Sequence, residues 1–343
     1  MEEKRTDVNT LGEFGLIDHL TRNTVIHHPA SLKGVGDDAA VIAGSDQVTL
    51  VTTDILAEGI HFDLMYTPLK HLGYKSVVVN LSDIYAMNGI PKQITVSIAL
   101  SNRFSVEALD ELYAGIHLAC KNYSIDLVGG DTTSSPKGLF ISVTAIGQVN
   151  AEDVVYRSGA REGDLICITG DLGAAYLGLQ LLEREKQIFQ STPGIQPEIK
   201  DQFSYLLSRQ LKPEAKKNVI DTFHKLHIKP HSMIDISDGL SSEIMHICKQ
   251  SGCGALIEEA LVPIHPLSTE LAVQFNLNPL TCAFNGGEDY ELLFTLSEKD
   301  FERIKYLPGF YVIGEIRPAE EGILLQTTGG KFLPLEAQGW RHM

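Results

Sequence analysis

The stretch Met233-Ile234-Asp235-Ile236-Ser237-Asp238-Gly239-Leu240 predicts a buried strand that turns directly into a helix. In a strand, Asp235 and Ser237 point to the same side. Asp238 then stands at a helix N-terminus, where backbone N–H groups favour anions. Because α/β folds place their ligand sites at such strand ends, the stretch indicates both a fold class and a candidate site.

Five further acidic clusters lie among glycines or small hydroxyl residues. They are Gly36-Asp37-Asp38, Thr52-Thr53-Asp54, Asn80-Leu81-Ser82-Asp83, Gly129-Gly130-Asp131-Thr132 and Gly286-Gly287-Glu288-Asp289. Carboxylates gathered without basic partners repel one another, and burial would protonate them. Hard cations with oxygen ligands resolve that conflict. The sequence therefore predicts a site for several Mg²⁺ ions, which would hold a polyphosphate.

Each cluster taken alone also fits a structural role. Gly36-Asp37-Asp38 could be a tight turn, and Thr52-Thr53-Asp54 at a strand end could be another. Asp83 alone could be a solvated helix residue, whereas the paired glycines before Asp131 let backbone approach a ligand closely. The joint occurrence favours a site, because surface turns have no reason to repeat this chemistry.

Composition narrows the class of protein. The chain has 343 residues, 43% of them hydrophobic, which is enough for two globular domains. A formal net charge of −16 argues against general nucleic-acid or anionic-membrane binding. No signal-peptide pattern or membrane-length apolar run occurs. The five cysteines form no C-x-x-C pair, which favours a reducing cytoplasm over a disulfide scaffold.

Strands and helices alternate along the chain, which predicts an α/β protein with two domains, 1–150 and 151–343. The boundary lies in polar, glycine-rich sequence around 150–163. Strands are predicted at 48–51, 94–100, 126–128, 139–149, 165–169, 233–236, 255–257, 290–295 and 310–316. Helices are predicted at 11–20, 69–87, 106–123, 172–184, 201–209, 213–226 and 238–248, with a loop at 187–198.

The familiar phosphate-binding motifs are missing. The sequence contains no Walker P-loop, no Rossmann fingerprint and no protein-kinase signature. Phosphate must therefore be held by metal ions and backbone. No Ser-His-Asp or Cys-His set can be argued either, and His246, Cys248 and Cys253 match no standard zinc spacing.

The order of the motifs resembles the thiamine-monophosphate kinase family, of the aminoimidazole-ribonucleotide-synthetase-like superfamily. The resemblance extends from about Gly12 to the C-terminus. It rests on 34–40 (GVGDDAA), 52–54 (TTD), 59–62 (GIHF), 80–83 (NLSD), 127–133 (LVGGDTT), 157–160 (RSGA), 234–240 (IDISDGL) and 285–292 (NGGEDYEL). Selenophosphate synthetases need a reactive residue near the N-terminus, whereas the first cysteine here is Cys120. The hydrogenase-maturation branch ends in cysteine, and the purine-synthetic branch lacks the GIHF segment.

This resemblance implies ATP-dependent phosphorylation of thiamine phosphate to thiamine diphosphate. It implies a homodimer whose N-terminal domains form a joint β-barrel, each backed by a C-terminal α/β domain. It also implies site residues. The metal-binding positions are Asp37, Thr52, Thr53, Asp54, Asp83, Asp131, Asp235 and Asp238. The ATP-contacting positions are Tyr113, Gly130, Asp131, Arg157 and Ser237. The substrate-contacting positions are His61, Glu288 and the late aromatic residue Trp340.

No general base is expected, because the acceptor phosphate has a second pKa of about 6 and is already ionised at neutral pH. Metal ions between donor and acceptor oxygens would support a direct in-line transfer. Two other classes stay open: an ATP-using synthetase of the same superfamily, and a non-catalytic metal–nucleotide binding module. An assay of thiamine diphosphate formation would separate the three.

Overall fold

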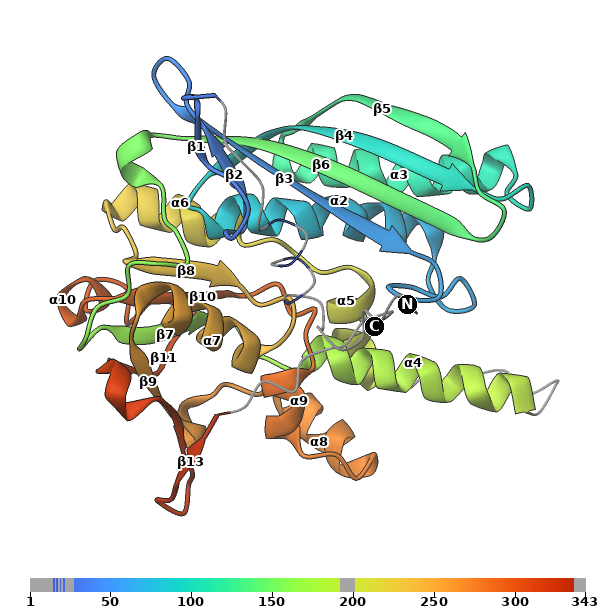
Figure 1. Ribbon diagram of the computed structural model, residues 1–343. Coiled ribbons are helices and arrows are strands. Elements are labelled where there is room, and N and C mark those ends of the chain that lie inside the picture. The colour runs from blue at the N-terminus through green and yellow to red at the C-terminus, as the bar shows by residue number, and fades with distance from the viewer. Residues whose placement is uncertain are drawn as a thin grey trace, which may run out of the picture.

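The computed structural model describes residues 28–191 and 201–335, together with Gly15, Ile17, His19 and Thr21. The described chain forms two β-sheets with helices packed on and between them, which confirms the predicted α/β class (Figure 1). Most of the predicted helix 11–20 lies outside the described residues. Within the described part, no helix has the length and apolar character needed to cross a bilayer.

The first sheet has six strands in the order β1-β2-β3-β6-β4-β5. Its strands are β1 (Ser31–Lys33), β2 (Ala40–Ile42), β3 (Val48–Ala57), β4 (Ile90–Leu100), β5 (Asp126–Ser134) and β6 (Leu139–Val149). Only β4 and β5 run parallel, and helix α3 (Val106–Tyr123) makes the crossover between them. The long antiparallel ladders of β6 with β3 and with β4 form the centre of the sheet.

Two predicted strands are longer than the sequence indicates. We expected β3 to end before Thr52, yet it continues to Ala57, which pairs with Phe140 of β6. We expected β5 to end before Gly129, yet it continues to Ser134 beside β4. Both polar clusters therefore lie inside strands rather than at strand ends. Ladder pairing with a long neighbour stabilises extended backbone even where polar or glycine residues interrupt the apolar pattern.

Helix α2 (Leu69–Ala86) lies between the first sheet and the second half of the chain (Figure 1). It is buried on nearly every side, as expected for a helix covered by a sheet on one side and another layer on the other. Its contact with α3 is close, because a Cβ on Gly115 would come within 1.9 Å of the Lys70 carbonyl oxygen. The helix that carries Asp83 is thus rigidly held.

The second sheet has seven strands in the order β13-β12-β9-β11-β7-β10-β8. They are β7 (Leu165–Thr169), β8 (Ser232–Asp235), β9 (Gly254–Glu258), β10 (Leu292–Leu296), β11 (Phe310–Arg317), β12 (Ile323–Gln326) and β13 (Phe332–Pro334). The strand β8 lies at one edge, beside α2. That position places Asp235, the last residue of β8, against the first half of the chain.

The remaining helices surround the second sheet. They are α4 (Ala174–Ser191), α5 (Ser204–Leu211), α6 (Lys217–Leu226), α7 (Leu240–Ser251), α8 (Pro266–Gln274), α9 (Pro279–Asn285) and α10 (Glu298–Phe301). Helix α4 continues past its predicted end into the predicted 187–198 loop, and α6 begins later than predicted. We did not predict α8, α9 or the short strands β1, β2, β12 and β13, which are too brief to show a clear period.

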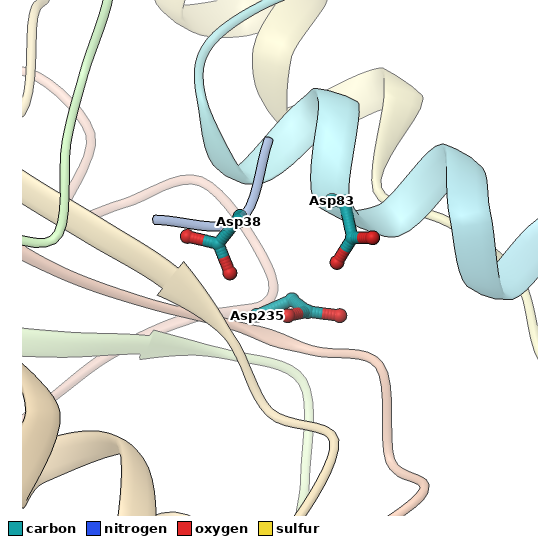
Figure 2. A group of neighbouring side chains, drawn as sticks. All are labelled: Asp38, Asp83 and Asp235. Atoms are coloured by element: carbon teal, nitrogen blue, oxygen red, sulfur yellow. The ribbon is translucent and has the colours of Figure 1, made fainter. Parts of the chain in front are cut away.

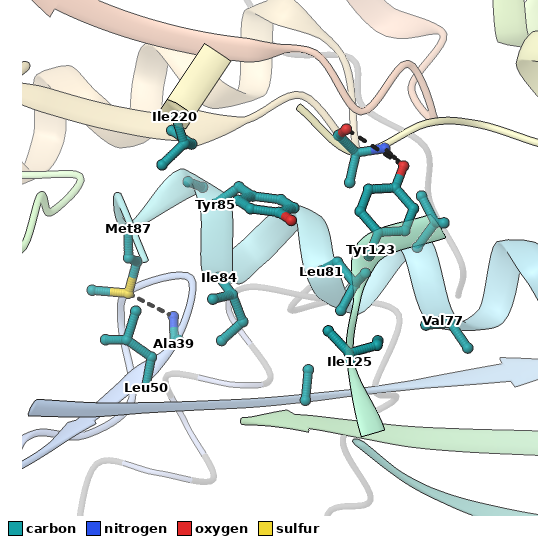
Figure 3. Close-up of a cluster of buried hydrophobic side chains, with 14 of the residues drawn as sticks. Ala39, Leu50, Val77, Leu81, Ile84, Tyr85, Met87, Tyr123, Ile125 and Ile220 are labelled. Atoms are coloured by element: carbon teal, nitrogen blue, oxygen red, sulfur yellow. Dashed lines mark hydrogen bonds between the residues drawn. The ribbon is translucent and has the colours of Figure 1, made fainter. Parts of the chain in front are cut away.

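One hydrophobic core joins the two halves. It combines residues of α2 and the first sheet with Phe223 of α6 and Phe294 of β10, whose rings meet edge to face at 5.3 Å. In Figure 3, Ile220 of α6 approaches Tyr85 from the side opposite the first sheet. Burial of this shared apolar surface fixes the relative position of the two sheets, and with it the residues that meet between them.

Candidate functional site

Three aspartates from distant parts of the chain meet between the two sheets. Ligand-type oxygens of Asp38, Asp83 and Asp235 lie within 4.8 Å of one another, and Figure 2 shows the three side chains converging. Asp38 follows the first strand, Asp83 lies near the end of α2, and Asp235 ends β8. We call this group the acidic cluster.

Each member of the acidic cluster is held by a specific contact. Thr52 donates its hydroxyl to Asp83 at 2.6 Å, and Ser82 donates to Asp235 at 2.6 Å. Arg157 binds Asp38 with two nitrogens, at 3.1 and 2.8 Å. The geometry is therefore set by hydrogen bonds from both halves of the chain.

The backbone beside Asp38 is also anchored to α2. The amide N–H of Ala39 donates to the sulfur of Met87 at 3.1 Å, just beyond the end of that helix (Figure 3). Ala39 and Met87 are both buried in the shared core. Packing thus brings the loop that carries Asp38 against the helix that carries Asp83.

Burial makes the cluster electrostatically unfavourable when all its members are charged. Loss of solvent raises the pKa of Asp235 to about 8 and that of nearby Asp54 to about 6. The pKa of Asp83 is raised well above its ordinary value, first by burial and then by Asp54 and Asp235. Burial also raises the pKa of Asp38, although Arg157 opposes that rise. The one guanidinium of Arg157 does not balance the charge of three carboxylates.

A hard divalent cation fits this donor set. Carboxylate and hydroxyl oxygens are the ligands that Mg²⁺ prefers, and several of them converge here on one point. Within the cluster, Arg157 provides a counter-charge to Asp38, while Asp83 and Asp235 accept hydrogen bonds from hydroxyl groups. A bound cation would remove the remaining repulsion.

Asp37 and Asp38 differ in their surroundings. The family resemblance predicts Asp37 as a metal-binding position. In the structure its carboxylate accepts from the Arg157 backbone N–H at 3.0 Å and lies 3.4 Å from the Lys33 ammonium. Asp38, to which we gave no role, occupies the cluster instead. Motif spacing alone cannot distinguish two adjacent aspartates in a loop, because their directions depend on the backbone turn.

Strand alternation separates the Thr52-Thr53-Asp54 group. Thr52 faces α2 and bonds Asp83, whereas Thr53 points to the other face of the sheet and donates to the Val143 carbonyl at 3.0 Å. Asp54 returns to the inner side, where its backbone N–H donates to the Asn80 side chain at 2.9 Å. Of this group, the structure brings Thr52 and Asp54 toward α2 but directs the Thr53 side chain away.

The turn after β8, residues 236–239, is paired with the loop 286–291. Backbone N–H groups of Glu288 and Tyr290 donate to the carbonyls of Ser237 and Ile236, at 2.7 and 2.9 Å. The contact is tight, since a Cβ on Gly287 would lie 2.6 Å from the Ser237 carbonyl oxygen. The predicted site residues Ser237, Asp238 and Glu288 thus lie on two backbone segments that are hydrogen-bonded to each other.

The two predicted substrate residues in the described chain lie near one small pocket. Lys75 of α2 contacts Glu288 at 2.8 Å, and Gln210 donates to the other Glu288 oxygen at 2.8 Å. Lys75 and Gln210 line a cavity of about 10 Å³ together with His61, whose Nδ1 accepts from the Ala57 backbone N–H at 3.0 Å. The sequence motifs do not indicate a site role for Lys75 or Gln210, since neither residue lies in an acidic motif.

A second group of predicted residues lies apart from the acidic cluster. Tyr113, Gly130 and Asp131 line an open cavity of about 490 Å³ beside β5. Ladder pairing runs from Asp54 through β6 and β4 to Gly130, which is three strand spacings. At about 4.8 Å each, these amount to roughly 14 Å within one chain. The structure does not bring this group to the cluster.

This chain is similar to known proteins over nearly its whole length. The family model described as AIR synthase related protein, N-terminal domain, matches residues 36–149. Thiamine-monophosphate kinases of Bacillus subtilis and Aquifex aeolicus are 33% and 35% identical, across 97% of this chain and 99% and 98% of theirs. The chain belongs to the thiamine-monophosphate kinase family.

A solved structure from the thiamine-monophosphate kinase family has the same fold. The structure of AaThiL complexed with AMPPCP and TMP matches with a TM-score of 0.85 at 31% identity. The match covers 99% of this chain and 100% of that one. Both sheets and the helices between them therefore have counterparts in a member of the thiamine-monophosphate kinase family.

One predicted position of the thiamine-monophosphate kinase site lies outside the described residues. Trp340, the expected late aromatic contact, follows the last described residue, Leu335. Glu243, which belongs to none of the predicted site motifs, accepts a hydrogen bond from the backbone N–H of Asp238. Its position five residues after Asp238, inside the first turn of α7, was the available signal.

Proposed function

We propose that this protein transfers the γ-phosphate of ATP to thiamine phosphate and forms thiamine diphosphate. Membership in the thiamine-monophosphate kinase family supports the reaction and both substrates. The similar structure of AaThiL contains AMPPCP and TMP together. The observation that carries the proposal in this chain is the acidic cluster, which provides oxygen ligands for the metal of a polyphosphate.

Mg²⁺ is the proposed cofactor. Asp38, Asp83 and Asp235 would hold it in the cluster, and Thr52 and Asp54 lie close to the same helix face. When bound, the ion neutralises phosphate charge and aligns donor and acceptor oxygens. Asp37, Thr53, Asp131 and Asp238 remain proposed metal-binding positions, with Asp37 and Thr53 directed elsewhere in this structure.

The protein's own groups have mainly positioning roles. Arg157, fixed against Asp38, would direct its guanidinium charge at phosphate oxygens. Ser237 and Asp238 would bind on the nucleotide side, and Glu288 with His61 on the thiamine side. The acceptor phosphate, with a second pKa of about 6, is already a nucleophile at neutral pH. A general base is therefore unnecessary.

We also propose that the chain works as a homodimer of two-domain subunits, 1–150 and 151–343. The first sheet exposes Ile55, Phe140 and Val128, and α2 and α3 cover only the other face. A second sheet face packed there would bury this apolar surface. It could also bring the Asp131 group of one chain near the acidic cluster of the other. The free cysteines favour the cytoplasm as the compartment.

A direct assay tests the proposed reaction. Purified protein is incubated with thiamine phosphate, ATP and MgCl₂, and thiamine diphosphate is quantified by fluorescence after oxidation to its thiochrome derivative. Product is expected with thiamine phosphate, and none with thiamine, which lacks the ionised acceptor. Turnover of an amide or formyl-amide substrate instead would indicate a synthetase of the same superfamily. Nucleotide binding without turnover of either would indicate a binding module.

A second experiment tests direct transfer. The protein is mixed with radiolabelled ATP alone, quenched in acid and examined for covalently bound phosphate. Direct in-line transfer predicts no labelled protein. A labelled protein that passes its phosphate to thiamine phosphate on a chase would exclude the direct route.

A further inference from the structure

Glu243 is a buried carboxylate that the reaction itself does not use. It lies in the first turn of α7 and is only 2% exposed. One oxygen accepts from the backbone N–H of Asp238 at 2.8 Å and from that of Ser237 at 3.3 Å. The other oxygen is buried and has no hydrogen-bond partner in the described structure. A buried carboxylate oxygen without a hydrogen bond destabilises the fold, so its presence calls for a structural or functional explanation.

The start of α7 leaves the turn before it without a side-chain cap. Its N-cap is Gly239, which has no side chain to accept the free N–H groups at a helix start. Gly239 has φ of +111°, and a Cβ there would lie 2.7 Å from the Phe284 carbonyl oxygen. A conventional Ser or Asp cap is therefore excluded by space and backbone conformation. Glu243 instead reaches back from inside the helix to the N–H groups of Asp238 and Ser237, the two residues before the N-cap, much as the carboxylate of a capping box reaches back to the N-cap N–H.

The same contact reaches the neighbouring loop. The N–H of Ser237 is held by Glu243, while its carbonyl accepts from the Glu288 N–H at 2.7 Å. Glu288 and Tyr290 both have positive φ, at 59° and 50°, which is unfavourable for residues other than glycine. Their conformation persists only while the surrounding hydrogen bonds hold it.

We propose that Glu243 is a positioning residue that sets the Ser237–Asp238 turn and the Glu288 loop in one arrangement. The inference rests on the proposed function, since it assigns those two segments to opposite ends of the same reaction. Loss of the Glu243 acceptor leaves two partly buried N–H groups unsatisfied and frees both segments together. Affinity for Mg²⁺–nucleotide and for thiamine phosphate should then fall in parallel.

Three substitutions separate this role from others. Glu243→Gln keeps an oxygen for the two N–H donors, Glu243→Met fills the space without an acceptor, and Glu243→Ala removes both. Glu185→Ala is the matched control, because Glu185 is also helical and buried, at 6% exposed, and accepts hydrogen bonds from Arg184 on α4, away from the Ser237–Asp238 turn. Each variant is measured for Mg²⁺–ADP affinity by calorimetry, KM of thiamine phosphate, kcat and thermal unfolding.

The proposal predicts Glu243→Gln within about threefold of the wild type in both affinities. Glu243→Met and Glu243→Ala should weaken both by about 10- to 100-fold, the usual effect of losing a group that orients ligating residues. Glu185→Ala should change neither affinity. If Glu243→Ala does not fold, the comparison of Gln with Met decides the question by itself.

Two results would overturn the proposal. Glu243→Gln as defective as Glu243→Met would show that the negative charge is needed, as for a direct metal ligand. Glu243→Met with wild-type affinities would show that the acceptor is irrelevant. A wild-type protein that binds Mg²⁺–ADP but never phosphorylates thiamine phosphate would refute the proposed function instead. The Mg²⁺–ADP affinities of the variants would still test the positioning role of Glu243.

Discussion

At the scale of single residues, Asp38 and Asp37 offer a matched pair. Asp38 lies in the acidic cluster, and Asp37 contacts Lys33 and the Arg157 backbone. We expect Asp38→Asn to lower the affinity for Mg²⁺, so that the Mg²⁺ concentration needed for half-maximal turnover rises by about 10- to 100-fold. Asp37→Asn should change that Mg²⁺ concentration much less. Mg²⁺ titrations of activity at saturating ATP measure both, and a larger effect of Asp37→Asn would contradict the assignment.

Asp235 predicts a pH dependence of stability in the metal-free protein. An aspartate in the unfolded chain loses its proton near pH 3.9, about the reference pKa. Burial raises the pKa of folded Asp235 to about 8. Between these values the folded state binds more protons than the unfolded state, so stability falls as pH rises. Thermal unfolding without metal should therefore occur at lower temperature at pH 8 than at pH 6.

Two comparisons assign that pH effect to the cluster. The asparagine of the Asp235→Asn variant cannot ionise, so the thermal-unfolding midpoint of this variant should fall less between pH 6 and pH 8. Added MgCl₂ should also reduce the fall, because the bound cation favours the ionised carboxylates. An equal fall in the wild type and in Asp235→Asn would place the effect elsewhere, for example on the histidines.

At the scale of elements, helix α2 determines the site. Asp83 and Asn80 reach toward the first sheet, while Ser82 and Lys75 reach Asp235 and Glu288 in the second half. Ser82 and Lys75 are seven residues apart and share one helix face. A shift of α2 by a fraction of a turn would disconnect both sides of the site.

The contact of α2 with α3 therefore predicts a mutational effect. In Gly115→Ala, the new methyl group would approach the Lys70 carbonyl oxygen to 1.9 Å. Relief of this clash would require the backbone of α2 or α3 to shift, which costs free energy. We expect a loss of about 3 kcal/mol in the free energy of unfolding. Urea unfolding measures it, with exposed Glu111→Ala on α3 as the control, which should stay within about 0.5 kcal/mol. Wild-type stability in Gly115→Ala would mean that the helices can separate freely.

The helix and strand bounds predicted from the sequence are correct where the spacing of apolar residues is regular over the whole element. The predicted bounds of α3, β6 and β7 are those of the structure, because each has an apolar pattern ended by polar or turn residues. The ends of β3 and β5 were wrong, since their extensions depend on partners far away in the chain. Local pattern cannot show that a neighbouring strand continues.

At the scale of the whole molecule, the proposed dimer can be tested by mixing inactive variants. Asp131 follows Gly130, which is three strand spacings, or about 14 Å, from Asp54, whereas Asp235 belongs to the acidic cluster. Asp131→Asn and Asp235→Asn therefore alter two separate groups of one chain. If each site combines Asp131 of one chain with Asp235 of the other, a mixed dimer has one intact site. After random exchange, equal mixing should restore about a quarter of wild-type activity.

The mixing experiment also gives a clear negative. If each site is built within one chain, every site in the mixture has one altered residue, and activity stays at the level of the single variants. Light scattering of the wild type provides the necessary control for the oligomeric state. A monomer at assay concentration would refute the homodimer directly.

The α/β class, the acidic motifs and their resemblance to a kinase family can all be predicted from the amino-acid sequence, because they depend on local composition and order. Tertiary structure alone decided that Asp38 rather than Asp37 joins Asp83 and Asp235, and that Thr53 turns away. It also revealed Lys75, Gln210 and Glu243. The physical reason is that side-chain direction depends on strand parity, backbone turns and the packing of α2 between two sheets.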